Sequence, residues 1–254
     1  MTTTAIVAST HDLEQGIPFA RSLRVEWRKS VDTRGARWLL SAVTLVAMIA
    51  AVVPLATPHR SAQDLSNYVA IMAIGVTLLL PVVSILTLTS EWSQRTVLTT
   101  FTQDPRRDRV LTAKLAAGLA LAGVGGLAGL GVASAALQVS DALGRPVSWN
   151  LGSSELIGYG LFVLLSSLMG MAFGALLHNT AAAIAAYFAL PTLITLVAVP
   201  LDGVRDWVDT ATTFPWILHG DWSGHTAQIL CSVGIWIVLP LLVGLARTVR
   251  RDAS

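Results

Sequence analysis

The sequence carries little charge and very few lysines. Only 13% of its 254 residues are charged and just two are lysine, whereas 54% are hydrophobic and the mean hydropathy is +0.65. A soluble domain has about a quarter of its residues charged, so this composition excludes an ordinary soluble protein and predicts a membrane protein. The single cysteine, Cys231, excludes an intrachain disulfide framework.

Two lysines leave no place for a nucleotide-binding loop. The phosphate-cradling motif G-x-x-x-x-G-K-[ST] needs a lysine directly after a glycine. Here Lys29 follows Arg28, and Lys114 follows Ala113. The chain is therefore expected to bind no cofactor, and any ATP that drives it would be bound by another chain.

The sequence predicts neither a catalytic residue nor a metal site. The five histidines show no His-x3-His spacing, and the net charge of +2 gives no reason to expect a nucleic-acid partner. Ser167 and His178 are separated by roughly 16 Å along one helix, so they cannot pair locally. A membrane-embedded hydrolase with a more distant serine–histidine pair stays open as an alternative.

Six apolar runs each approach the roughly 20 residues that cross a hydrocarbon core of about 30 Å as a helix. None of them contains Asp, Glu, Lys or Arg. Because a charge inside the membrane usually marks a proton relay or an ion pathway, a proton-driven carrier is disfavoured. The sequence predicts an all-α membrane protein with six transmembrane helices, at about 38–57, 68–89, 115–139, 156–177, 181–201 and 226–246.

Positively charged residues gather on one side of these runs. If both termini are inside, 14 of the 17 Lys and Arg residues fall in cytoplasmic segments. Lys and Arg are enriched in short cytoplasmic segments. The sequence therefore predicts a multi-pass protein of the plasma (inner) membrane of a bacterium, with N-in/C-in topology.

The chain before the first run divides into a tail and an amphipathic helix. Residues 1–18 show no hydrophobic period and predict a flexible cytoplasmic tail. Apolar residues then recur every four positions from Phe19 to Trp27, with arginines on another face. This pattern predicts an interfacial connecting helix over 19–35, ahead of a transmembrane domain over 36–254. A solvated extension of the first span is the alternative.

Residues 90–114 form the long basic interruption between the second and third runs. Each of its cations would cost roughly 2.5 to 3.5 kcal/mol at the centre of a membrane helix, so the segment is expected to project into the cytoplasm. Val97, Leu98 and Phe101 share one helical face before Pro105 ends the helix. A short helix with an apolar side is therefore predicted, available to a partner. A loop that only sets the topology is the alternative.

The same residues resemble the signature of the ABC-2 type permeases, the membrane subunits of ATP-binding cassette exporters. That signature runs E-x4-T, then P-x-R, then K. The matching positions here are Glu91, Thr96, Pro105, Arg107 and Lys114. Arg95 departs from the family pattern, which commonly has Gly before the Thr. Glu26-x2-Lys29 with Arg34 is similar to the connecting helix of that family.

The resemblance implies the ABC-2 type exporter fold, working as a dimer with a second permease copy or a related permease. It also implies separate ABC ATPase subunits that bind ATP and Mg²⁺. The ATPase-coupling residues that it implies are Glu91, Trp92, Arg95, Thr96, Phe101, Pro105, Arg106, Arg107 and Lys114. The connecting-helix residues are Phe19, Leu23, Glu26, Trp27, Lys29 and Arg34. The implied activity is export, and the uncharged spans suit an amphipathic or hydrophobic substrate. A non-transporting membrane scaffold or sensor is the further alternative.

Two other features concern packing and the outer surface. Gly125 with Gly129, and Gly170 with Gly174, follow the GxxxG pattern, which predicts either close packing within the chain or a contact between subunits. Residues 202–224 combine aspartates with tryptophans and predict short interfacial helices. In the family this extracellular segment is often re-entrant. A simple extracellular loop is the alternative.

Overall fold

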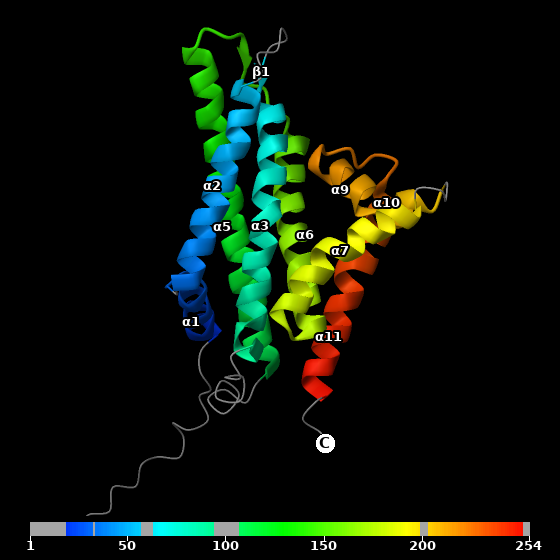
Figure 1. Cartoon of the computed structure of the whole chain (residues 1–254). Helices are drawn as coiled ribbons and strands as arrows, with labels where there is room; N and C mark the ends of the chain where they lie inside the picture. The colour runs from blue at the N-terminus through cyan, green and yellow to red at the C-terminus, as the bar shows by residue number, and fades with distance from the viewer. Residues whose placement is uncertain (1–18, 33, 57–62, 94–106, 199–202, 251–254) are drawn as a thin grey trace, which may run out of the picture.

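The chain folds into a bundle of long helices with two short strands at one end (Figure 1). The computed structural model describes residues 19–32, 34–56, 63–93, 107–198 and 203–250. The elements are α1 (Phe19–Asp32), α2 (Arg34–Ala56), β1 (Gln63–Asp64), α3 (Leu65–Ser93), α5 (Arg107–Ala142), β2 (Val147–Ser148), α6 (Ser153–Leu177), α7 (Thr180–Ala198), α8 (Arg205–Val208), α9 (Thr210–Leu218), α10 (Thr226–Val233), η2 (Gly234–Val238) and α11 (Leu239–Arg250).

Within the described residues, six helices are long and apolar enough to cross a membrane. They cover Arg37–Ala56, Leu65–Glu91, Arg109–Ala142, Ser153–Leu177, Thr180–Val197 and Thr226–Thr248. The sixth joins α10 and α11 through η2, a π-helical segment of five residues. The prediction of an all-α membrane protein is confirmed.

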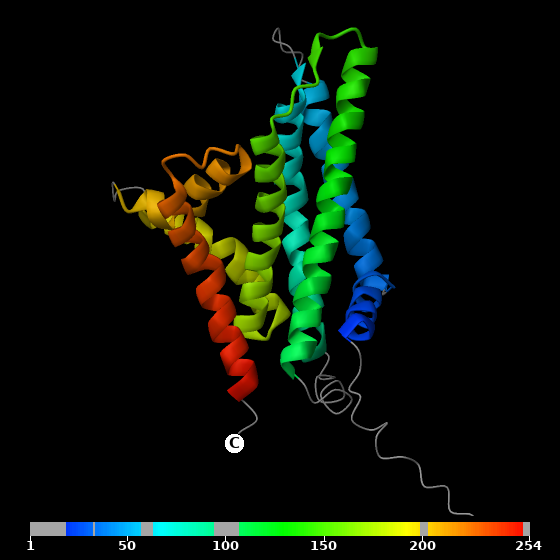
Figure 2. The same ribbon diagram turned by 180° about the vertical axis from the view of Figure 1, so that it is seen from behind.

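Helix α3 lies at the centre of the bundle, where it packs against α2, α5 and α6. Its side chains Tyr68, Met72, Leu80 and Ile85 are fully buried. Figures 1 and 2 show α2, α3, α5 and α6 side by side, while α7 and α11 pack against the lower part of α6 and diverge from it toward the top of the view.

The GxxxG glycines face neighbouring helices of the same chain. A Cβ at Gly170 would lie 2.8 Å from the Pro81 carbonyl oxygen, and one at Gly174 would lie 3.1 Å from Thr89 Cγ2. On α5, a Cβ at Gly125 would lie 2.9 Å from Leu80 Cδ1, and Gly129 faces Val76 and Tyr159 in the same way. Small residues let helix backbones approach closely in lipid, and here they do so within the chain.

The bundle has two distinct ends, which we call the α1 end and the β end. Helix α1, the last turns of α3 and α11 and the first turn of α5 lie at the α1 end (Figure 1). At the β end, Gln63 of β1 pairs in parallel with Val147 of β2. The Tyr68 hydroxyl donates to Gln63 Oε1 at 2.7 Å and lies 2.8 Å from Ser140 Oγ, which fastens the strands to α3 and α5.

The predicted loop over 90–114 is too long at both ends. Helix α3 continues to Ser93 and α5 already begins at Arg107, so Lys114 lies inside a helix instead of projecting from a loop. The physical reason is charge pairing: Glu91 and Lys114 lie close enough to form an ion pair, so each can stay in a helix that packs against protein.

The segment over 202–224, predicted to lie outside, contains the short helices α8 and α9. The Asp209 side chain accepts a hydrogen bond from the backbone N–H of Ala211 and so caps the start of α9. Helix α9 packs against α6, with Phe214, Ile217 and Leu218 buried.

Candidate functional site

Helix α1 packs against the first turns of α5 and presents one short acidic and basic motif to the bundle. Glu26 and Ser30, one turn apart, are the buried residues of this helix. The Ser30 hydroxyl donates to the Glu26 carbonyl oxygen at 2.9 Å. This face therefore brings a carboxylate to the point where α3 ends and α5 begins.

Four charged side chains from three helices meet there in a closed ion network. Lys29 Nζ lies 2.9 Å from Glu26 Oε1 and 2.9 Å from Glu91 Oε1. Lys114 Nζ lies 2.8 Å from Glu26 Oε2 and 3.0 Å from Glu91 Oε1. Each lysine of the chain thus bridges the same two carboxylates, and α1, α3 and α5 are joined by charge.

Burial differs sharply between the two lysines. The Lys114 side chain is 6% exposed and those of Glu26 and Glu91 are 8% and 10% exposed, whereas Lys29 is 46% exposed. Two buried carboxylates next to one buried ammonium would leave an uncompensated negative charge. Lys29 supplies the second positive charge, so the network is neutral as a whole.

The surroundings of Lys29 favour its charged form. Partial burial disfavours the ammonium, but hydrogen bonds to Glu91 and Glu26 outweigh burial and raise the pKa of Lys29 above its ordinary value of 10.5. A lysine whose pKa is higher in the folded than in the unfolded chain stabilises the fold at any pH below its pKa in the unfolded chain. This stabilisation is lost as the pH rises through its pKa in the folded chain. The loss therefore begins only in strongly alkaline solution.

The structure brings together four of the predicted site residues, namely Glu26, Lys29, Glu91 and Lys114. Phe19 and Leu23 on α1 are half-buried, and Arg34 at the start of α2 is exposed. Trp27 is partly buried and packs with Val31 against a core cluster of Val43, Val83 and Leu121.

The other predicted coupling residues fall at the ends of α3 and α5 or between these helices in the sequence. Trp92 lies in the last turn of α3, and Arg107 is the first residue of α5. Arg95, Thr96, Phe101, Pro105 and Arg106 lie outside the described residues, as does the predicted short helix that contains Phe101.

A second feature, missed in the sequence, is an apolar groove of about 560 Å³ bounded by α3, α6, α7 and α9. Its walls combine aromatic and aliphatic side chains such as Phe162, Leu78 and Phe214 with the hydroxyls of Ser166 and Thr195. No charged side chain lines it among the described residues. Such a surface suits an uncharged amphipathic molecule.

Asp209 is the other buried charge that sequence reasoning missed. Its carboxylate accepts from Thr195 Oγ1 at 2.6 Å, from the Ala211 N–H at 2.9 Å and from Arg205 Nε at 3.2 Å. Burial would raise the pKa of this carboxyl, but the hydrogen bonds outweigh it and hold the pKa below the ordinary value of 3.8. The order Asp209-Thr-Ala-Thr-Thr is typical of a helix start and was the available signal.

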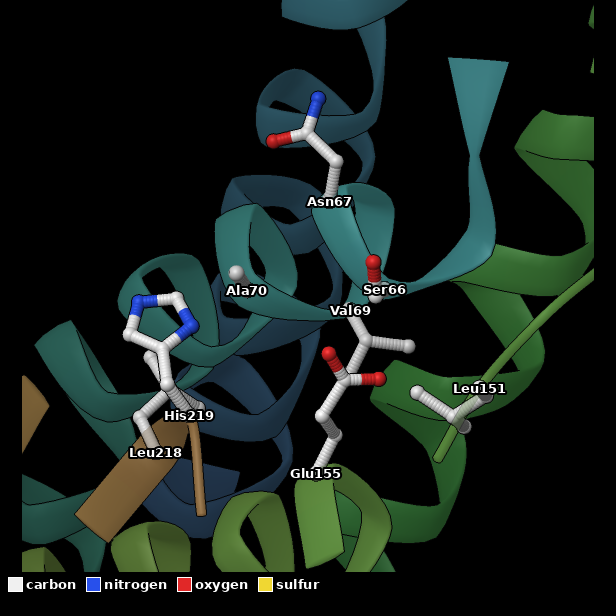
Figure 3. Close-up of a pocket in the computed structure, with 8 residues that line it drawn as sticks. All are labelled: Ser66, Asn67, Val69, Ala70, Leu151, Glu155, Leu218 and His219. Atoms are coloured by element: carbon white, nitrogen blue, oxygen red, sulfur yellow. The ribbon is translucent and has the colours of Figure 1, made fainter. Parts of the chain in front are cut away.

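A smaller cavity of about 200 Å³ lies at the β end, between α3 and the start of α6 (Figure 3). Glu155 points toward Ser66 and Val69 there, and His219 stands near Ala70. Glu155 Oε2 already accepts a hydrogen bond from the Gly152 N–H at 2.9 Å. Its carboxylate is thus used in starting α6.

Ser167 and His178, the serine and histidine compared in the sequence, do not pair. Ser167 Oγ is buried and makes no hydrogen bond to any described group, while His178 Nε2 lies 2.7 Å from Thr248 Oγ1. The serine–histidine pair therefore does not form among the described residues. The same residues also contain no cluster of three or more His, Cys, Asp or Glu that could hold a metal ion.

A scan against protein-family models finds no match for this chain, and a search of curated proteins finds no significantly similar relative.

Proposed function

We propose that this chain is the membrane-spanning permease subunit of an ABC-2 type exporter. The observation that carries the proposal is the ion network of Glu26, Lys29, Glu91 and Lys114. These residues belong to the two segments in which the sequence resembles that family. Residues in contact between the two segments lie 62 to 88 positions apart along the chain, yet all four meet in one closed set of contacts.

The network has the mechanical properties that an energy-coupling element needs. Glu91 lies two residues before the end of α3, and Lys114 lies in the second turn of α5, so the segment between these helices is clamped on both sides. Lys29 and Glu26 tie α1 to the same clamp. A push on α1 or on the segment at 94–106 would therefore move α3 and α5 together, because breaking buried charge pairs is costly.

The distribution of charge supports an orientation with the α1 end in the cytoplasm. Basic residues in the described ranges concentrate at that end, on α1, at the start of α2 and α5 and at the end of α11. At the β end they are represented by Arg145, and by Arg205 in the outer segment. This asymmetry follows the positive-inside rule. ATPase subunits would dock at the α1 end.

The groove between α3, α6, α7 and α9 is the proposed route for the substrate. It offers apolar contact area with a few hydroxyl groups and no charge among the described residues. Helix α7, which forms one wall, leaves Leu193, Leu196 and Val197 exposed. A second permease copy packed on this face would enclose the groove. The cargo class is therefore an uncharged or weakly charged amphipathic compound.

The test is energy coupling in a reconstituted complex. The tagged chain is purified from its host, and an ATPase subunit with a phosphate-binding lysine motif is expected to copurify. In vesicles, Glu91→Lys and Lys114→Glu are each expected to uncouple ATP hydrolysis from substrate efflux at least tenfold. The double exchange alone leaves like charges in contact with Glu26 and Lys29, so it should stay uncoupled. Adding Glu26→Lys and Lys29→Glu restores opposite charges at all four contacts and should recover most of the coupling.

One variant serves as the control, and each contrary outcome gives a different result. Asp141→Asn removes an exposed acid near the β end and should leave coupling unchanged. Coupling that survives Glu91→Ala together with Phe101→Asp would refute the assignment. A purified chain that turns over a substrate alone would indicate the hydrolase alternative. A complex without ATPase activity or efflux would indicate the scaffold or sensor alternative.

A further inference from the structure

A second apolar cavity, of about 240 Å³, lies between α1, α2, α3 and α5 near the α1 end. Its walls include Trp27, Val43, Leu80, Leu121 and Ala128, and the backbone of glycines on α5. The polar side-chain groups of its lining residues are the indole N–H of Trp27 and the Thr44 hydroxyl, which already donates to the Leu40 carbonyl oxygen at 3.0 Å. The cavity therefore offers few hydrogen bonds to water.

The cavity opens sideways, onto the surface that faces the membrane. Thr44 on α2 and Val124 and Ala128 on α5 line it and are nevertheless exposed. They are flanked by exposed apolar side chains such as Leu45 and Leu127. Figures 1 and 2 show α2 and α5 as neighbours above α1. An apolar slot that opens on the exposed side of two membrane-length helices and offers few hydrogen bonds suits an alkyl chain.

Two arginines stand at the α1 side of this slot. Arg24 and Arg28 precede the lining residues Trp27 and Val31 by three positions each, so they lie beside them on the surface of α1. Both arginines are exposed, and neither forms an ion pair with another described residue. The neighbouring carboxylate, Glu26, is occupied by the two lysines. The guanidinium groups remain available to an anion.

We propose that this slot is a binding site for one anionic phospholipid of the leaflet at the α1 end. Its acyl chain fills the cavity between α2 and α5, and its phosphate binds Arg24 and Arg28. Arginine binds phosphate with paired N–H donors, and basic residues near the surface attract anionic lipid. The lipid bridges α1 to α2 and α5 and holds α1 in its docked position, whether or not the chain transports a substrate.

The experiment is native mass spectrometry of the full chain with added phosphatidylglycerol or phosphatidylcholine. One tightly held phosphatidylglycerol is expected per chain. Arg24→Gln with Arg28→Gln should weaken its binding about 30-fold, and Ala128→Trp, which fills the slot, should abolish it. Matched controls are Arg247→Gln, an exposed arginine on α11, and Leu127→Trp, next to Ala128 but outside the slot. Both controls should bind as the unaltered chain does.

A second measurement needs no variant and so does not depend on how a variant folds. Phosphatidylglycerol with a photoreactive group in its acyl chain is cross-linked to the unaltered chain in vesicles. Adducts are expected on Leu40–Ala47 and Leu121–Val132. Adducts spread evenly over the lipid-facing helices would overturn the proposal. So would equal retention of both lipids, or unweakened binding in the Ala128→Trp chain.

Discussion

Lys29 and Lys114 bind the same two carboxylates but differ in exposure, so the pair offers an internal comparison of charge burial. Lys114→Met leaves two buried carboxylates with one half-exposed partner, and we expect a loss of about 3 to 5 kcal/mol in the free energy of unfolding. Lys29→Met also leaves one carboxylate uncompensated, but water reaches this half-exposed position and screens the charge, so the loss should be smaller, about 1 to 2 kcal/mol.

Thermal unfolding of the purified chain, followed by the reaction of Cys231 with a fluorogenic maleimide, measures both losses. Cys231 is partly buried and is the only cysteine, so its reaction reports unfolding directly. Lys114→Arg keeps the charge and serves as the control. Equal losses for the two Met variants would show that the burial of Lys114 has no energetic consequence.

Asp209 should give the outer segment a dependence on acidic pH. Its folded pKa is depressed, so its stabilising contribution is complete above the unfolded pKa and is lost as the pH falls through the folded pKa. Asp209→Asn should therefore lower stability by about 2 kcal/mol at pH 7. The gap to the unaltered chain should persist down to about pH 4 and close below it.

Unfolding temperatures of both chains between pH 7 and pH 2 test this expectation. Asp206→Asn is the control, because Asp206 is exposed and lies three residues away. A gap that already closes above pH 5 would mean that the hydrogen bonds from Thr195 and Ala211 do not hold the carboxylate in its charged form.

At the scale of single elements, α6 carries two glycines with opposite surroundings. A Cβ at Gly170 would lie 2.8 Å from the backbone oxygen of Pro81, whereas a Cβ at Gly160 would meet nothing within 4 Å. We expect Gly170→Ala to force α3 and α6 apart and to destabilise the chain by about 1 to 3 kcal/mol. Gly160→Ala should be neutral or stabilise by up to about 1 kcal/mol, since alanine favours helix.

The same thermal assay separates the two glycines, with Gly160→Ala acting as the matched control. If both variants lost stability equally, the close contact between α3 and α6 would not matter. The Ile85 side chain, 3.3 Å from the position of the added Cβ, is the other group that would have to move.

The elements also show which features the sequence could predict. Six apolar runs were enough to predict six spanning helices, because hydrophobicity over about 20 residues is a local property. The predicted ends of α3 and α5 were wrong, because the observed ends depend on the pairing of Glu91 and Lys114. Glu26, which pairs with Lys114, is distant in sequence. A lone lysine predicts a loop at the membrane edge, whereas a lysine that two carboxylates neutralise can stay in a buried helix. Likewise, the π-helical turn of η2 has no local signal.

The sequence predicted which residues belong to the site, but not how they are arranged in space. The resemblance placed Glu26 with Lys29 in one motif and Glu91 with Lys114 in another. Their meeting is a tertiary contact between α1, α3 and α5, which no local pattern encodes. For the same reason the slot beside Trp27 was unforeseen, since it is formed by four different helices.

At the scale of the whole molecule, the distribution of charge predicts which end faces the cytoplasm. In a Cys231→Ser background, single cysteines at Asn67 and Asp141 lie at the β end, and those at Arg24 and Arg247 lie at the α1 end. All four native side chains are exposed, so access to a reagent is limited only by the membrane. A membrane-impermeant maleimide added to intact cells should label the first pair, and the second pair only after lysis.

This labelling pattern tests the proposed coupling to an ATPase as well as the orientation, because the ion network and the basic face of α1 lie at the same end of the bundle. If Arg24→Cys and Arg247→Cys react from outside, the network faces away from ATP and cannot receive force from a cytoplasmic ATPase. If a fraction of both pairs reacted in intact cells, the chain would be inserted in both orientations. The distribution of 14 basic residues on one side against three on the other should prevent such dual insertion. The expected pattern leaves the clamp between α1, α3 and α5 where an ATPase can push on it.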